Sequence, residues 1–269
     1  MSNDDIIWNV KKNSILKLAE AGKRIDDRAF DEYRKIELIN NYVPRAEGST
    51  LIKLGKTQLI AGVKVETMTP FPDTPEEGIL MINGELVPIA SNDFFSGPPD
   101  EDSIELARVV DRGVRESKMV DVSKLCITPG ELVYSVMVDI HVLDYDGNLF
   151  DAANIAVVNA LWNAKMPKVE DGKIVKNDVS DKEYSGFVPV KEKPMSCTFV
   201  KLGSKNLIDP IIDEEKVSDC RMTMTITEKD CMCAAQKSNF GFYSKADLDE
   251  MLDMAILKSK ENRKFIVRE

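Results

Sequence analysis

Histidine is almost absent from this chain: among its 269 residues there is one, His141. It lies within the apolar segment Val136–Leu143, which reads as a buried strand, so we predict a hydrogen-bonded imidazole in the core. With a single histidine, the chain cannot form a metal site that needs several histidine ligands. The same scarcity argues against a histidine-dependent catalytic triad.

Cysteine pairing and the common catalytic motifs are missing as well. The five cysteines, which are Cys126, Cys197, Cys220, Cys231 and Cys233, form no CxxC pair. We therefore expect core thiols and no metal or redox site. Walker-type glycine-rich loops, GxSxG elbows and HExxH helices do not occur either, which removes the function classes that depend on them.

Long hydrophobic runs are lacking too. No segment approaches the roughly 18 apolar residues that a transmembrane helix requires, and the acidic start Met1–Asp5 does not resemble a secretory leader. Apolar residues make up 43% of the chain, enough for a full core. We expect a globular protein of the cytoplasm with no membrane partner.

Positive charge is in deficit, because the formal net charge is -10. Binding of nucleic acid that depends on phosphate contacts needs a positive surface. Any nucleic-acid site on this chain must therefore be local.

The chain contains an internal duplication. Residues Ser49–Ile60 and Cys197–Ile208 align without gaps, and six of the twelve positions are identical. In each copy an apolar strand ends at Leu-Gly, turns tightly and enters a second strand. Chance similarity between two hairpins is the alternative explanation.

Both hairpins lead toward a helix, which supports a true repeat. We expect the first helix from Asp102, acting as N-cap, to about Lys118. The second runs from Ser244 to about Lys260 and opens with a capping box, Ser-Lys-Ala-Asp. We therefore predict an α/β fold of two pseudo-repeated sheet-plus-helix halves, roughly residues 30–145 and 190–262.

A third helix is expected from Asn148 to about Ala164. Its small and almost wholly apolar residues indicate burial between the two halves. The polar stretch Met166–Lys173 then reads as a hairpin with an Asp-Gly turn. Proline-rich segments at Pro70–Pro75 and Gly97–Pro99 indicate exposed loops.

The first helix concentrates basic side chains. Arg108, Arg112 and Arg115 recur at spacings that place them within about 60° of one another around the helix axis. A phosphate-binding row is the functional interpretation, because arginine binds phosphate oxygens in a bidentate manner. The alternative is a solvated face whose arginines pair with Glu105, Asp111 and Glu116.

An acidic run, Asp209–Glu215 followed by Asp219, offers carboxylates for a hard cation or for acid-base chemistry. Runs of this kind are more often solvated loops, and we expect a loop here.

At this point the ordered set of motifs resembles the archaeal exosome ring subunits of the RNase PH family, and specifically the inactive member of the pair. The segments that carry the resemblance are Gly22–Arg28, Ala46–Thr50 with Lys53–Thr57, Glu105–Glu116 and Asp144–Asn148. The likeness extends over nearly the whole chain. It implies one RNase PH-like domain over residues 1–269, with an N-terminal helix at roughly 6–20.

Two departures from the family pattern bear on activity. Active members carry a Gly-Ser-Arg or Gly-Thr-Arg turn at a helix N-terminus, where the backbone and the arginine hold the attacking phosphate. Here the turn reads Gly147–Phe150, with an amide in place of the hydroxyl and no arginine. The family's essential carboxylate lies in a longer acidic loop, so whether Asp219 aligns with it is left open.

The resemblance implies a non-catalytic subunit, with no catalytic residue and no cofactor of its own. Three copies would alternate with three copies of a catalytic homologue in a hexameric ring that degrades RNA from its 3′ end. Inorganic phosphate would be used in the homologue's site, and RNA-binding cap proteins would join the ring. Arg112 and Arg115, then Arg108, are the residues expected to bind RNA.

Two other classes stay open: an autonomous phosphorolytic RNase or nucleotidyltransferase, and a purely structural scaffold without RNA contact.

Overall fold

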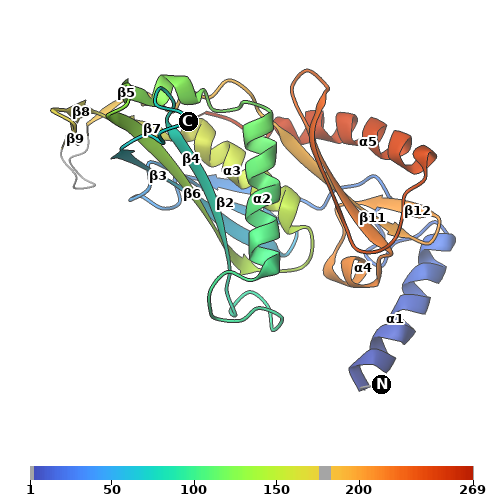
Figure 1. Cartoon of the computed structure of the whole chain (residues 1–269). Coiled ribbons are helices and arrows are strands. Elements are labelled where there is room, and N and C mark those ends of the chain that lie inside the picture. The colour runs from blue at the N-terminus through green and yellow to red at the C-terminus, as the bar shows by residue number, and fades with distance from the viewer. Residues whose placement is uncertain (1–2, 176–182, 269) are drawn as a thin grey trace.

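The computed structural model describes residues 3–175 and 183–268 of the chain. Two β-sheets and the helices between and beside them form successive layers (Figure 1). We call them the large sheet and the small sheet. Both expected halves are present, each as a sheet with helical cover.

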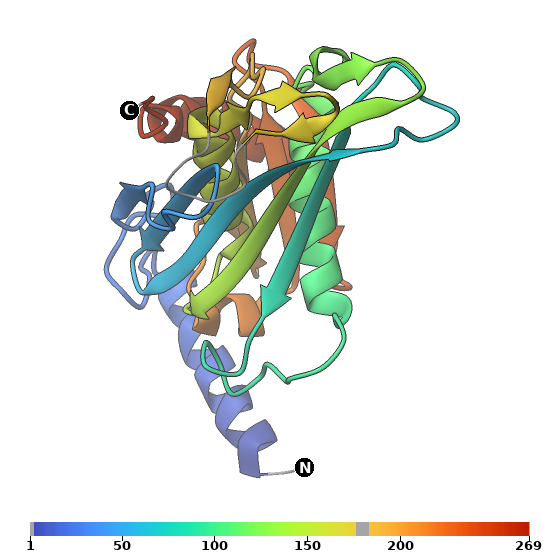
Figure 2. The same cartoon turned by 90° about the vertical axis from the view of Figure 1, so that its left-hand side faces the viewer.

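The large sheet has the strand order β1-β2-β3-β6-β4, with β5 paired to β6. Its strands are β1 (Ile36–Asn40), β2 (Gly48–Leu54), β3 (Thr57–Met68), β4 (Ile79–Leu86), β5 (Cys126–Thr128) and β6 (Leu132–Asp144). β4 runs parallel to β6, and the other pairings are antiparallel. Along β3, buried residues alternate with partly exposed ones, so one face of the sheet belongs to the core. Figure 2 looks onto the opposite face, which none of the described helices covers.

The small sheet has the order β12-β11-β13-β14 and is antiparallel throughout. Its strands are β11 (Met195–Leu202), β12 (Lys205–Ile208), β13 (Cys220–Ile226) and β14 (Met232–Ser238). The two predicted hairpins are β2-β3 and β11-β12, and they turn through Gly55 and Gly203 at φ values of 59° and 60°. Glycine adopts this left-handed conformation without strain. The duplication seen in the sequence is therefore a structural repeat.

Two helices lie between the sheets, α2 (Glu101–Glu116) and α3 (Leu149–Asn163). α3 contacts β2 and β3 on one side and β11 on the other, and every residue from Phe150 to Leu161 is buried. Gly48 allows this close packing, because a Cβ atom there would lie 2.5 Å from the carbonyl oxygen of Ala160. The prediction of a helix buried between the halves is confirmed.

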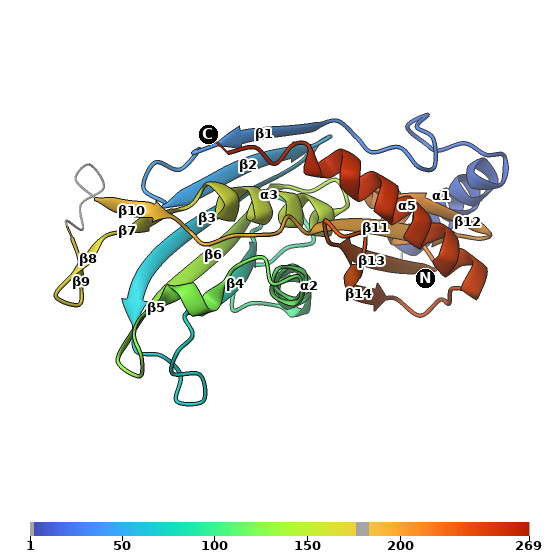
Figure 3. The same cartoon turned by 90° about the horizontal axis from the view of Figure 1, so that it is seen from above.

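The remaining helices lie on the outside. α5 (Lys245–Arg263) covers the far face of the small sheet through Met251 and Ala255, as Figure 3 shows from above. Its capping box, in which Ser244 and Asp247 exchange hydrogen bonds, is confirmed. α1 (Asn3–Glu20) projects away from the body at its N-terminal end and packs by Ile15 and Ala19 near the small sheet (Figure 1).

Short elements complete the chain. They are the 3-10 helix η1 (Val122–Leu125), α4 (Ile212–Val217), and the strands β7 (Lys165–Pro167), β8 (Val169–Glu170), β9 (Lys173–Ile174) and β10 (Tyr184–Phe187). β8 and β9 pair around Asp171 and Gly172, both at positive φ, which confirms the Asp-Gly hairpin.

The prediction of a core imidazole is wrong. His141 lies on β6 as expected, but its side chain is 47% exposed, and its Nδ1 atom is 3.2 Å from Oε2 of Glu85 on β4. Ile140 and Val142 take the inward positions of the strand, so the alternation of side chains sends His141 to the uncovered face.

The prediction for the cysteines holds only in part. Cys197 and Cys220 are buried, whereas Cys126 and Cys233 are half-buried and Cys231 is exposed. Cys231 precedes β14, which is an edge strand of the small sheet and offers no second neighbour to cover it.

The first helix also starts earlier than expected. Asp100 is its N-cap, since one carboxylate oxygen of Asp100 accepts the N–H of Ser103 at 2.9 Å. Asp102, the predicted cap, lies in the first turn.

Candidate nucleic-acid interface

Helix α2 presents the predicted arginine row to solvent. Leu106, Val109, Val110 and Val114 are buried on its inner face, as their spacing predicted. Arg108, Arg112 and Arg115 are all exposed. This placement agrees with the spacing argument.

The three guanidinium groups differ in their contacts. Arg115 lies 2.8 Å from a carboxylate oxygen of Asp111 and also donates to the backbone oxygen of Leu80 at 2.9 Å. Arg112 has one weak contact, at 3.5 Å, with Oε1 of Gln236 on β14. Arg108 has no ion pair or hydrogen bond to any residue of 3–175 or 183–268. Two of the three charges are therefore without a carboxylate partner in the described chain.

Glu105, which the solvated-face interpretation paired with this row, is engaged elsewhere. Its Oε2 atom accepts from Arg221 of β13 at 3.0 Å. Its Oε1 atom accepts from Ser238 and Gln236 of β14 at 2.6 and 3.3 Å. Glu105 thus joins α2 to the small sheet and leaves Arg108 and Arg112 uncompensated.

A groove lies on each side of the arginine row. The β4 groove has a volume of about 250 Å³ and is lined by Ile82, Ala107, Arg108, Asp111, Arg112, Arg115 and Glu116. The β14 groove has a volume of about 330 Å³ and is lined by Glu101, Ile104, Glu105, Arg108, Val109, Arg112 and Gln236. Because Arg108 and Arg112 line both grooves, the row forms a ridge between them.

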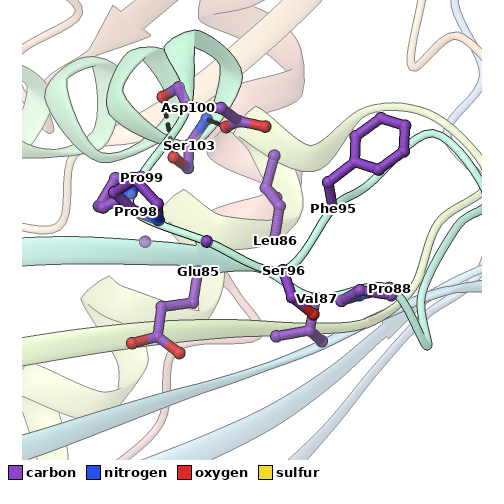
Figure 4. Close-up of a pocket in the computed structure, with 12 residues that line it drawn as sticks. Glu85, Leu86, Val87, Pro88, Phe95, Ser96, Pro98, Pro99, Asp100 and Ser103 are labelled. Atoms are coloured by element: carbon purple, nitrogen blue, oxygen red, sulfur yellow. Dashed lines mark hydrogen bonds between the residues drawn. The ribbon is translucent and has the colours of Figure 1, made fainter.

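Another pocket, of about 290 Å³, lies where the loop after β4 meets the start of α2 (Figure 4). Phe95, Pro98 and Pro99 form part of its wall, and Glu85 and Asp100 supply carboxylates. No lysine or arginine is among the residues that line it, so it does not suit a phosphate group.

The turn before α3 is the second region of interest, because the family resemblance places a phosphate site there. Gly147 has a φ of 85°, and a Cβ atom on it would lie 2.5 Å from the carbonyl oxygen of Pro210. Asn148 is the N-cap of α3, is fully buried and adopts a left-handed conformation. Its Nδ2 atom donates to Asp151 at 2.9 Å and to Asp209 at 2.6 Å. The amide that replaces the family's hydroxyl is therefore part of an internal network.

The backbone at this helix N-terminus is occupied as well. The N–H of Asn148 donates to Oε1 of Glu215 at 2.9 Å, and the hydroxyl of Tyr145 donates to Oε2 at 2.8 Å. The Glu215 side chain is 8% exposed, and Arg221 lies 4.0 Å from it. A helix N-terminus attracts anions through its free N–H groups and its dipole. Here a carboxylate of the chain itself takes the place of an external anion.

Burial and the neighbouring carboxylate of Glu215 raise the pKa of Tyr145 well above its ordinary value. The phenol therefore stays protonated and donates its hydrogen bond to Glu215 over the whole ordinary pH range.

The acidic run is not the solvated loop that we expected. Burial opposes ionisation of Asp209, but hydrogen bonds and charge from Arg34, with further charge from Arg28, keep its pKa below the ordinary value. Glu214 is buried against Arg24 at 2.5 Å. The arginines of the Gly22–Arg28 motif thus neutralise carboxylates more than 180 residues away. Sequence separation hid this pairing.

Asp219 lies at a different place. One of its carboxylate oxygens accepts the N–H of Gly203 in the β11-β12 turn at 3.2 Å, and the side chain is 43% exposed near Lys12.

Within the described residues, no group of three or more acidic, histidine or cysteine side chains is placed to hold a metal ion. No helix in that part of the chain is both long enough and apolar enough to span a bilayer.

Sequence reasoning named Glu105 and Glu215 but did not foresee their partners, and it did not single out Gln236. Their contacts join segments that are 67 to 133 residues apart. No local pattern marks such a pairing, so only the fold reveals it.

The fold and this surface together define a class: an α/β protein of two sheet-plus-helix halves that carries a local cationic ridge on an acidic body. The chain belongs to the 3′ exoribonuclease family. The model of the family's domain 1 matches residues 32–167, and the model of its domain 2 matches residues 193–257.

Named relatives agree with this assignment. The protein of Thermococcus gammatolerans named exosome complex component Rrp42 is 46% identical over 271 residues, which cover 99% of this chain and 97% of that protein. A chain in the Archaeoglobus fulgidus exosome with RNA bound to the active site superposes with a TM-score of 0.90 at 44% identity, covering 97% of this chain and 100% of that one. A chain of an archaeal exosome core gives a TM-score of 0.86 at 42% identity, with 98% of each chain covered. The RNase PH-like fold expected from the motifs is therefore confirmed.

Proposed function

We propose that this chain is a non-catalytic, RNA-binding subunit of a phosphate-dependent 3′-to-5′ exoribonuclease of the exosome type. The observation that carries the proposal is the exposed row of Arg108, Arg112 and Arg115 on α2, in a chain of net charge -10. Since the rest of the molecule repels a polyanion on average, RNA would contact this ridge in preference to other surfaces. The similarity to exosome subunits, one of them in a complex with RNA, supports this.

The second part of the proposal is that the chain has no phosphorolytic site of its own. Glu215 occupies the N–H of Asn148, and Leu149 stands where active family members carry the phosphate-binding arginine. A phosphate entering here would meet a buried carboxylate with like charge and no new cation. Inorganic phosphate would instead be used in the site of a catalytic homologue.

The partners proposed are those that the family resemblance implies. Three copies of this chain alternate with three copies of the catalytic homologue in a closed ring, and RNA-binding cap proteins join it. RNA passes from the caps toward the homologue's sites, and this chain supplies backbone contacts beside them. The assembly would work in the cytoplasm.

The test compares RNA decay in phosphate buffer by this chain alone, by the catalytic homologue alone and by the co-expressed pair. We expect no nucleoside diphosphate from this chain alone. The pair should form a ring in sedimentation and degrade RNA faster than the homologue alone. A matched pair carrying Arg112→Glu should form the same ring and retain RNA less well.

Each rival class predicts a different result. Phosphate-dependent turnover by a clean preparation of this chain would establish an autonomous phosphorolytic enzyme and overturn the proposal. A ring whose RNA affinity is unchanged by Arg112→Glu would establish a structural scaffold without RNA contact.

A further inference from the structure

The β14 groove has features that a phosphate-binding ridge does not need. Its floor includes Ile104, a large apolar side chain that is 47% exposed, and Val109, which is 7% exposed. Ile104, Arg108 and Arg112 follow one another at four-residue spacing, so they lie along one face of α2. The apolar patch therefore continues directly from the arginine row.

We propose that the β14 groove is a nucleoside subsite, which receives one base of an RNA strand whose phosphates contact the arginines of α2. The inference rests on the proposed function, because it places the strand on this ridge. A phosphate on Arg108 or Arg112 brings the attached ribose and base to one side of the ridge. A base on the β14 side covers Ile104 and Val109 and removes their apolar surface from water.

Gln236 gives this groove a polar wall. Its Nε2 atom donates to Oε1 of Glu105 at 3.3 Å, and its Oε1 atom receives the weak contact from Arg112. A carboxamide has two N–H donors and two acceptor lone pairs, so one donor and one acceptor position stay available to a ligand. Such a group can bond to the edge of either a purine or a pyrimidine. The subsite is therefore expected to accept every base.

Charge alone does not separate the two grooves. In the β14 groove the two oxygens of Glu105 are taken by Arg221, Ser238 and Gln236, and Glu101 is exposed. In the β4 groove Asp111 pairs with Arg115, and Glu116 is exposed. Each groove thus has one exposed carboxylate, which repels an RNA strand, beside Arg108 and Arg112, which attract it. The exposed Ile104 and the carboxamide of Gln236 line the β14 groove and favour it as the base subsite.

The experiment uses the assembled ring in phosphate-free buffer, where RNA binds without being degraded. The probes are an oligoadenylate and a series of the same oligonucleotide with one abasic ribonucleotide at each successive position. An abasic position keeps its phosphate and loses its base, so it separates a base subsite from a phosphate contact. We expect one register at which the abasic RNA binds the unaltered ring roughly fivefold more weakly.

Two variants connect that register to this groove, Ile104→Ser and Gln236→Ala. In each variant, intact RNA should bind more weakly, and the ratio of the affinity for intact RNA to that for abasic RNA should fall toward one. The salt dependence of binding should stay the same, because no phosphate contact is lost. The matched control is Ile39→Ser, since Ile39 on β1 is also 47% exposed. It should leave the penalty unchanged.

Three results would overturn the subsite. The first is abasic RNA that binds with the same affinity at every register. The second is an abasic penalty that persists in both variants. In the third case Ile104→Ser or Gln236→Ala prevents ring assembly while assembled rings bind RNA normally, which would make the groove a protein contact. Failure of the proposed function itself looks different, because Arg112→Glu would then leave RNA affinity unaltered.

Discussion

The arginine row allows a quantitative prediction, since each phosphate contact contributes a known increment to salt dependence. For single-stranded nucleic acid, neutralising one phosphate adds about 0.7 to the slope of log affinity against log salt. Arg112 has no carboxylate partner among the described residues, so Arg112→Gln should reduce the slope by about that full increment. Arg115 shares its charge with Asp111, and Arg115→Gln should cost the same increment or less.

The double variant Arg112→Gln, Arg115→Gln should therefore lower the slope by up to about 1.4. When salt rises from 50 to 200 mM, the affinity of both rings should fall. The fold decrease for the variant ring should be smaller than that for the unaltered ring by a factor of up to about seven. Both side chains point away from the buried valines of α2, so the fold should be retained.

The assay is equilibrium binding of a labelled oligoribonucleotide to the assembled ring at four or more salt concentrations. Lys245→Gln provides a matched control, because it removes one positive charge from α5, where the side chain is 91% exposed and paired with Asp249. Its slope should equal that of the unaltered ring. If the double variant and this control give the same slope, Arg112 and Arg115 do not contact phosphate and the reasoning from helix spacing fails for both.

Three further predictions concern the interior. Glu215→Gln should lower the free energy of unfolding by about 1 to 3 kcal/mol, because the α3 N-terminus loses its anion; unchanged unfolding in urea would contradict this. Burial raises the pKa of Asp151 to about 6, although hydrogen bonds from Asn148, Tyr33 and Thr198 act in the opposite direction. Because the folded state disfavours the ionised carboxylate, the contribution of Asp151 to the free energy of unfolding should decrease as pH rises from about 4 through 6. Asp151→Asn should lack that component in unfolding curves measured across the range, and a variant with the unaltered pH profile would refute it. Because α3 packs on both sheets, heating should unfold the whole chain in one transition by calorimetry and by circular dichroism; two resolved transitions would separate the halves into independent domains.

The face of His141 and the N-cap of α2 were both predicted wrongly, because in each case the local sequence allows two arrangements and only packing selects one. The strand containing His141 was predicted correctly, yet the choice of face was wrong, because alternation leaves two registers and only packing selects one. Asp100 took the cap predicted for Asp102, since both are acidic residues within one turn and the competition depends on the loop that precedes them.

By itself, the sequence determined the features that depend on neighbouring residues. Hairpin turns, helix periodicity and the arginine spacing follow from local geometry, and the repeat follows from matching two segments of the sequence to each other. Only the tertiary structure decided which charges remain free. Glu105 and Glu215 each lie close in sequence to other candidate partners, yet they bind β14 and the start of α3 across large separations. Because ion pairs and hydrogen bonds act through space and not along the chain, the state of Arg108 and of the α3 N-terminus is a property of the fold.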